Sequence, residues 1–319
     1  MYRLIACSLL ASWLFGITVA QVPPHCQPSF NGTVGNGKAG SEQRLNGTTI
    51  RKIKAPDANQ GVAVDAEHFY SIDNFSITKH RKNNSAPVLQ WYGGANGPII
   101  HLDGGVVING TLFAPHSNYP MAPITSSVEM WDVKTMQHIG SHSFGINRGS
   151  MTWLDQHNGN WYGTFANYDR VQPGQTQPYG LTMNTQMVQM NDKFEIVRSW
   201  IFPAILYNTF KPMSNSGGSF GKDGWLYITG HDASAAYVIK VPSAGSVLIW
   251  VATISLPDIA GQGIAWDRSG TGNGNLWGIS RDSLEVVEMR VPTQACGPDA
   301  ALPVGRVLGP RQFIDPSSD

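Results

Sequence analysis

The sequence predicts an all-β fold, a single β-propeller, with five blades favoured and six left open. Three observations lead to this prediction: the composition, a repeat of strand pairs, and one strand near the N-terminus that has no neighbour of its own. Only 14% of the 319 residues are charged, while 35 are glycine and 10 are tryptophan. That composition is typical of many short strands joined by turns, and it disfavours a helical bundle.

Five segments share one pattern: a small or amide residue, an apolar strand, a polar turn, and a second strand rich in aromatic residues. They are 60–74, 104–118, 149–169, 217–232 and 261–282. Their first residues lie 44, 45, 68 and 44 positions apart, and the longest interval contains a turn-rich insertion (170–180) and a loop (211–216). A period of about 40 to 50 residues with four strands per unit indicates a β-propeller.

The ring is expected to close by joining its two ends. Two further strand-like segments follow each of the first four repeats, but only one, 284–292, follows the fifth. The segment 47–56, which precedes the first repeat, can supply the missing outer strand. A sixth blade stays open if the tail or residues 170–215 form one. The expected organisation is a signal peptide (1–20), an N-terminal segment (21–46), one propeller domain (47–296) and a C-terminal tail (297–319).

The first twenty residues have the features of a secretory signal. Arg3 precedes an apolar run over 4–19, and Thr18 and Ala20 are the small residues before the expected cleavage. A membrane anchor is the alternative, but the run is short for a bilayer. We therefore expect a protein of the secretory pathway, secreted or vesicular, with no membrane span after cleavage.

Sequons and cysteines agree with secretion. Five Asn-x-Ser/Thr sequons predict glycosylation at Asn31, Asn46, Asn74, Asn83 and Asn109. Cys7 leaves with the signal peptide, and the remaining pair, Cys26 and Cys296, is expected to form a disulfide that joins the two ends of the ring.

The charge balance excludes some partners. The chain has 22 basic and 22 acidic residues, whereas proteins that bind nucleic acid or anionic membranes favour a basic excess. The expected partner is a small, mostly apolar molecule.

The repeat also predicts where a site lies. In a propeller, the start of the first strand and the end of the second lie on one face near the axis, and polar residues gather there in every repeat. The expected binding residues are Gln60, His101, Asn118, Tyr119, Ser150, Asn167, Tyr168, Asp232 and Gln262. Convergent polar groups in a concavity indicate a binding site, although any one of them can instead cap a strand end. The opposite ends carry Asp-containing turns that fit hairpin chemistry and need no function.

A metal or a serine nucleophile is not expected on this face. The first strands begin near Gln60, Ser150, Ser216 and Gln262, with no carboxylate, and Asp232 is the best carboxylate nearby. No HExxH spacing occurs, and Ser117 cannot readily bond the neighbouring His116, because adjacent residues of a strand point to opposite faces. Without a cofactor, the remaining histidines suit general acid–base catalysis. His116 or His231 is the expected acid–base group, and Arg148 or Arg281 the group that stabilises developing negative charge.

Several stretches, among them QGVAVDAEHFYSI, GPIIHLDGGVVINGTLFAPHSNYP and GQGIAWD, resemble secreted microbial propeller proteins labelled cycloisomerase-like, which are distant relatives of the gluconolactonase superfamily. The similarity covers roughly residues 55–292. In size and composition the chain also resembles the fungal hetero-Diels–Alderases of tropolone-sesquiterpenoid biosynthesis. That resemblance implies the coupling of a quinone methide, formed from a hydroxymethyl tropolone by loss of water, to a humulene-type sesquiterpene. Two alternatives remain: a divalent-metal-dependent lactone hydrolase and a non-catalytic carbohydrate-binding propeller.

Overall fold

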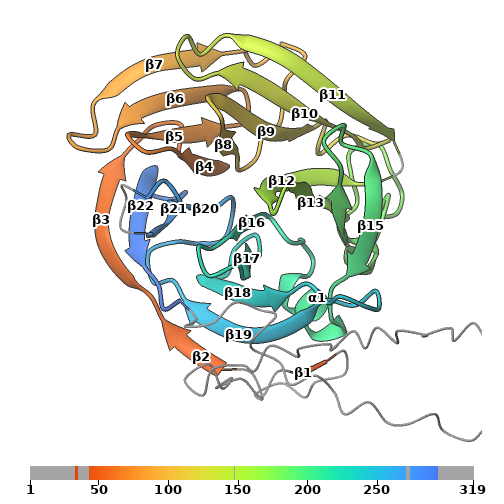
Figure 1. The fold of residues 1–319 in the computed structure, drawn as a ribbon. Helices are drawn as coiled ribbons and strands as arrows, with labels where there is room; N and C mark the ends of the chain where they lie inside the picture. Colours follow the sequence, from red (N-terminus) through yellow and green to blue (C-terminus); the bar gives the residue numbers. More distant parts are fainter. Residues whose placement is uncertain (1–32, 35–42, 147, 271–273, 294–319) are drawn as a thin grey trace, which may run out of the picture.

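The computed structural model describes residues 33–34, 43–146, 148–270 and 274–293, and in them five four-stranded blades surround a central axis (Figure 1). The five-bladed propeller predicted from the repeat is therefore confirmed. The expected signal peptide, Cys26, Cys296, Asn31 and the C-terminal tail lie outside the described residues.

Each blade is an antiparallel meander that begins at the axis and ends at the rim (Figure 1). The first blade contains β4 (Gly61–Val64), β5 (His68–Asp73), β6 (Ser76–Arg81) and β7 (Pro87–Tyr92). The second contains β8 (Val106–Ile108), β9 (Thr111–Ser117), β10 (Thr125–Asp132) and β11 (His138–Ile146). The third contains β12 (Ser150–His157), β13 (Asn160–Ala166), β14 (Gln186–Met190) and β15 (Ile196–Ile201). The fourth contains β16 (Gly217–Phe220), β17 (Leu226–Thr229), β18 (Ala235–Lys240) and β19 (Ile249–Ser255).

The fifth blade closes the ring with a strand from the other end of the chain. Its strands are β20 (Ala265–Trp266), β21 (Leu276–Ser280), β22 (Glu285–Arg290) and β3 (Thr48–Lys54). β3 pairs antiparallel with β22, with Lys54 opposite Glu285. Arg51 and Glu288 reinforce the pair through an ion pair of 2.6 Å. The closure predicted from the partnerless N-terminal strand is thus confirmed.

Two short strands before residue 47 extend the fourth blade at its rim. β1 (Thr33–Val34) pairs antiparallel with β19, and β2 (Gln43–Asn46) pairs parallel with it. The segment 170–215 forms no additional blade, because it supplies β14 and β15 to the third blade together with a short 3₁₀ turn (η2, Thr182–Asn184) and one helix.

That helix, α1 (Ala204–Phe210), was not predicted from the sequence. Its buried side chains, Leu206, Tyr207 and Phe210, recur at helical spacing and pack against Trp153 and other residues of the third and fourth blades. Seven residues are too few for a helix to be stable alone, so this packing stabilises it. Within the described residues, no helix has the length and apolar character needed to cross a membrane.

The aromatic residues of the repeats pack between neighbouring blades. Trp277 of the fifth blade stacks on Phe69 of the first at 5.4 Å between ring centroids, and Trp91 meets Trp131 at 5.0 Å between the first and second blades. Trp131 and Trp277 are fully buried. Each such ring buries about 150–250 Å², which at about 25 cal/mol per Å² stabilises the contact by about 4–6 kcal/mol.

Three glycines close the axis. A Cβ atom on Gly61 would lie 2.6 Å from the Cα of Gly104, and one on Gly104 would lie 2.7 Å from the Cα of Gly263. These distances are shorter than van der Waals contact, so the backbones of the first, second and fifth blades meet where only glycine fits. Cavities at the two ends of the axis share no lining residue.

A candidate active site at the axis

A cavity of about 260 Å³ lies at the end of the axis where the first strands begin. All five blades contribute to it, as the repeat predicted. The structure brings together seven of the predicted site residues, namely Gln60, His101, Tyr119, Tyr168, His231, Gln262 and Arg281. Five further residues line it: Asp103, Thr152, Arg170, Met213 and Ser216.

Asp103 is the most unusual group in the cavity. It lies in the short segment before β8, where its backbone N–H donates to the carbonyl oxygen of Pro115 at 3.1 Å. Asp103 is 3% exposed, and its Oδ2 has no hydrogen-bond partner among the described residues. Burial raises the pKa of this carboxyl group well above its ordinary value, and the charge of Arg281 opposes this only in part. Asp103 is therefore a carboxylic acid that favours its protonated form.

His101 presents an unprotonated nitrogen to this acid. Its Nδ1 lies 2.7 Å from Oδ1 of Asn74, which also accepts a hydrogen bond of 2.9 Å from Nε2 of Gln60. Because an amide oxygen only accepts, the proton of His101 is on Nδ1. Nε2 then carries a lone pair, 3.8 Å from Oδ2 of Asp103. Burial, followed by the charges of His116 and Arg281, lowers the pKa of His101 to about 4, so the ring is neutral at neutral pH.

A second histidine is part of a chain of three side chains. Nδ1 of His231 lies 2.5 Å from Oδ1 of Asp232, and its Nε2 lies 3.3 Å from Nη1 of Arg281. Arginine only donates, so Nε2 accepts and the proton of His231 is on Nδ1. Burial lowers the pKa of His231, which favours this neutral state. Asp232 is itself exposed and lies outside the cavity, so it acts on the site through His231.

One wall of the cavity is apolar. The rings of Tyr119 and Tyr168 lie 4.8 Å apart, and Tyr168 packs in a cluster with Ile124 and Met213. Burial raises the pKa of Tyr168, so its hydroxyl group stays protonated. The wall therefore combines aromatic surface with a hydroxyl donor, which suits a flat organic molecule.

The longest interval in the repeat brings two loops to this face. Arg170 begins the 170–180 insertion, and Met213 comes from the 211–216 loop. The two segments are joined by hydrogen bonds from Oγ1 of Thr182 to the carbonyl oxygen of Met213 at 2.8 Å and from the N–H of Asp169 to that of Pro212 at 3.0 Å. The irregular part of the chain thus builds part of the cavity.

His116 and Arg148 are corrections to the sequence-based assignment. His116 lies on β9 with Nε2 accepting from the N–H of Ile100 at 3.2 Å and Nδ1 lying 3.0 Å from Oγ of Ser127, so both nitrogens are engaged within the second blade. Arg148 is exposed and does not line the cavity. Neither residue lines the axial cavity.

Three predicted binding residues instead satisfy neighbouring groups. Asn118 accepts from the N–H of Thr125 at 2.8 Å, and Nδ2 of Asn167 donates to the carbonyl oxygen of Arg148 at 3.2 Å. Ser150 is fully buried, with its Oγ 2.6 Å from Oγ of Ser117. They correspond to the alternative in which polar residues at strand ends cap the backbone or fill the core.

Sequence reasoning missed four lining residues: Asp103, Thr152, Arg170 and Met213. A signal existed for Asp103, since HLDGG places an acidic residue directly before the first strand of the second repeat. That carboxyl group corrects the expectation of an axial face without acidic residues at the strand starts. Among the described residues, no group of three or more His, Cys, Asp or Glu could hold a metal ion.

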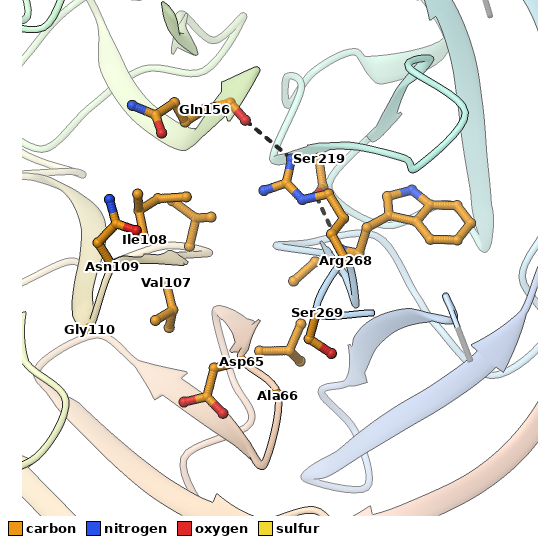
Figure 2. Close-up of a pocket in the computed structure, with 14 residues that line it drawn as sticks. Asp65, Ala66, Val107, Ile108, Asn109, Gly110, Gln156, Ser219, Arg268 and Ser269 are labelled. Atoms are coloured by element: carbon orange, nitrogen blue, oxygen red, sulfur yellow. Dashed lines mark hydrogen bonds between the residues drawn. The ribbon is translucent and has the colours of Figure 1, made fainter. Parts of the chain in front are cut away.

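A larger cavity, of about 480 Å³, lies at the opposite end of the axis (Figure 2). Its charged groups are already satisfied. Asp65 accepts from the N–H groups of Glu67 and His68 at 2.8 and 2.7 Å. Arg268 donates to the carbonyl oxygen of Gln156 at 3.2 Å, as Figure 2 shows, and to Oδ1 of Asp155 at 2.6 Å. These contacts fit the hairpin chemistry expected at this end, so the smaller cavity with Asp103 is the candidate site.

The four sequons within the described residues differ in their surroundings. Asn46, Asn83 and Asn109 are exposed, and Asn109 lies at the rim of the larger cavity (Figure 2). Asn74 is half-buried, and its amide group belongs to the hydrogen-bond network of His101. This position holds a ring of the candidate site in place.

Comparison with known proteins supports the fold. No protein-family model matches the chain, and no curated protein matches it by sequence. A glutaminyl cyclase of Myxococcus xanthus is similar in structure, with a TM-score of 0.55 and 14% identity over 78% of this chain and 98% of that chain. A PQQ-bound aldose sugar dehydrogenase of Streptomyces coelicolor has a TM-score of 0.45 and 12% identity over 79% of this chain and 83% of that chain. At 14% identity, the likeness to the glutaminyl cyclase shows the propeller fold alone.

Proposed function

We propose that this protein is a secretory-pathway enzyme that removes water from a small hydroxyl-bearing substrate and promotes cyclisation or cycloaddition of the product. One observation carries the proposal: a buried carboxyl group, Asp103, lines the axial cavity with no partner for its Oδ2 among the described residues. A carboxylic acid whose pKa is raised by burial is suited to donate a proton to a leaving hydroxyl group.

The proton balance of such a step is simple. The Asp103 acid donates its proton to the substrate hydroxyl group, the C–O bond breaks, and water leaves. Asp103 becomes a carboxylate, which is then reprotonated from solvent, with the neutral Nε2 of His101 3.8 Å away as a relay. A substrate that carries a negative charge elsewhere becomes a neutral, electron-poor alkene-ketone.

The specific reaction that we propose is a hetero-Diels–Alder coupling. A hydroxymethyl tropolone that loses water gives a quinone methide, which adds to a double bond of a humulene-type sesquiterpene. The cavity of about 260 Å³ lies just below the roughly 300–1,000 Å³ typical of pockets for drug-sized ligands, so it suits the tropolone ring alone. The terpene would lie against the apolar wall that includes Tyr119, Tyr168 and Met213. Holding two partners in one orientation supplies much of the rate of a cycloaddition.

The test uses purified protein with a hydroxymethyl tropolone and a humulene-type sesquiterpene, and it measures the coupled product. Asp103→Asn removes the acid while keeping its shape, and we expect the rate to fall by roughly 10²- to 10⁴-fold. Asp65→Asn, at the opposite cavity, is the matched control and should leave the rate unchanged. Wild-type turnover by Asp103→Asn would refute the acid role. Loss of turnover on chelation would instead favour the metal-dependent lactonase alternative.

A further inference from the structure

The axial cavity presents two guanidinium groups and one carboxyl group. Arg170 and Arg281 both line it, whereas the carboxyl group of Asp103 favours its neutral form. Neither arginine forms an ion pair with a carboxylate in the part of the chain that the structure describes. Both histidines that line the cavity are neutral in the hydrogen-bond pattern described above. The net charge of the lining is therefore positive.

Neutral partners orient both arginines. Nη1 of Arg281 lies 3.3 Å from Nε2 of His231, and its Nε lies 3.4 Å from Oδ1 of Asn59. Nη1 of Arg170 lies 3.4 Å from Sδ of Met213. Because these acceptors carry no charge, they hold the guanidinium groups without neutralising them. His231 is itself held by Asp232, so Arg281 is positioned by a chain that begins outside the cavity.

We infer that the cavity binds a small organic monoanion, a carboxylate or an ionised enol, with its charged oxygen atoms at Arg170 and Arg281. Planar guanidinium groups donate two parallel hydrogen bonds to such oxygens, and these bonds are among the strongest in proteins. Two positive charges that lack a carboxylate partner in a concave site attract an anionic ligand more strongly than a neutral one. The inference rests on the proposed function in taking this cavity as the substrate site, and it names the substrate class.

The anion also completes the chemistry proposed for Asp103. A substrate bound as an anion has already lost one proton, so a single proton from Asp103 is enough to expel water and leave a neutral product. A neutral product binds less well than an anion between two arginines, which favours its movement toward the apolar wall. His231 acts here as a positioning residue for Arg281, in contrast to the acid–base role expected from the sequence.

The test measures binding of benzoate and of benzamide, its neutral counterpart, by titration calorimetry at pH 7 and low salt. We expect benzoate to bind the wild-type protein at least tenfold more tightly than benzamide does. Arg170→Gln and Arg281→Gln should each weaken benzoate binding by roughly tenfold or more. Arg148→Gln, which removes an exposed arginine outside the cavity, is the matched control and should bind like wild type. His231→Leu should also weaken binding, and His231→Gln, which keeps an acceptor, should restore part of it.

Three results would overturn the inference: no benzoate binding at millimolar concentration, equal binding of benzoate and benzamide, or wild-type binding by both arginine variants. Arg170 is exposed, so its variant stays informative even if Arg281→Gln fails to fold. Benzoate affinity of the wild-type protein should also fall as salt is added. The Asp103→Asn variant separates the two proposals. If the wild-type protein binds benzoate and Asp103→Asn turns over at the wild-type rate, the acid role alone is refuted. If Asp103→Asn loses turnover but the wild-type protein does not bind benzoate, the anion site alone is refuted.

Discussion

Replacing Asp103 by asparagine should make the protein more stable at neutral pH, by an amount that grows with pH. Burial raises the folded-state pKa of this carboxyl group well above its ordinary value of 3.8. Between those two pKa values the folded state keeps a proton that the unfolded state releases, so wild-type stability falls as pH rises. Each pH unit in that window costs about 1.4 kcal/mol. Asparagine has nearly the same shape and does not titrate, so the free energy of unfolding of the variant does not fall with pH for this reason.

The assay is urea unfolding of the wild-type protein and Asp103→Asn at several pH values between 4 and 7, with the free energy of unfolding extrapolated to water. Other carboxyl groups titrate equally in both proteins, so their difference isolates Asp103. We expect the two free energies to be closest near pH 4 and to separate above it, by up to about 1.4 kcal/mol per pH unit until the pH reaches the folded-state pKa of Asp103. A constant difference across this range, or a variant that loses stability as pH rises, would refute the raised pKa.

Two further predictions concern the glycines and the sequons. Gly104→Ala should reduce the free energy of unfolding by about 1–3 kcal/mol, because the added methyl group meets backbone on the axis. Gly140→Ala, where the nearest atom is the flexible end of Met130 at 3.3 Å, is the control; equal losses would contradict this account of the axis. Peptide mapping of the secreted protein should find glycan on Asn83 and Asn109 but not on Asn74, whose amide group is bonded inside the candidate site. A glycan on Asn74 in active protein would contradict the role given to its network.

The repeat predicted the blades because the alternation of apolar strands and turns is a local property that recurs along the chain. It also indicated the face on which the candidate site lies, since strand direction alternates within each blade. It could not show to which side His116 points, because adjacent residues of a strand point to opposite faces and the register of β9 is set by its neighbours. Ser117 is the buried one, and His116 bonds within its own blade.

The rest of the site depends on contacts between distant segments. Asp103 is buried beside Gly104, which meets Gly61 and Gly263 of other blades, and no local pattern reveals this contact. Arg170 and Met213 belong to long loops, and the path of such loops is not encoded in strand periodicity. The sequence indicated only that the longest interval in the repeat was unusual. In the structure that interval supplies one of the two cations of the proposed anion site.

Closure of the ring by β3 cannot occur until the last blade has been synthesised. This strand leaves the ribosome before any blade, yet its partner β22 follows much later, with 231 residues from Lys54 to Glu285. At about 5–20 residues per second, β3 waits roughly 10 to 50 s with an unpaired edge. Exposed edges invite aggregation, and positive side chains discourage it. We therefore expect the positive side chains of β3 to keep the unpaired strand soluble before the ring closes. In the folded protein the same side chains pair with acidic groups: Arg51 with Glu288, Lys52 with Asp258 and Lys54 with Glu285.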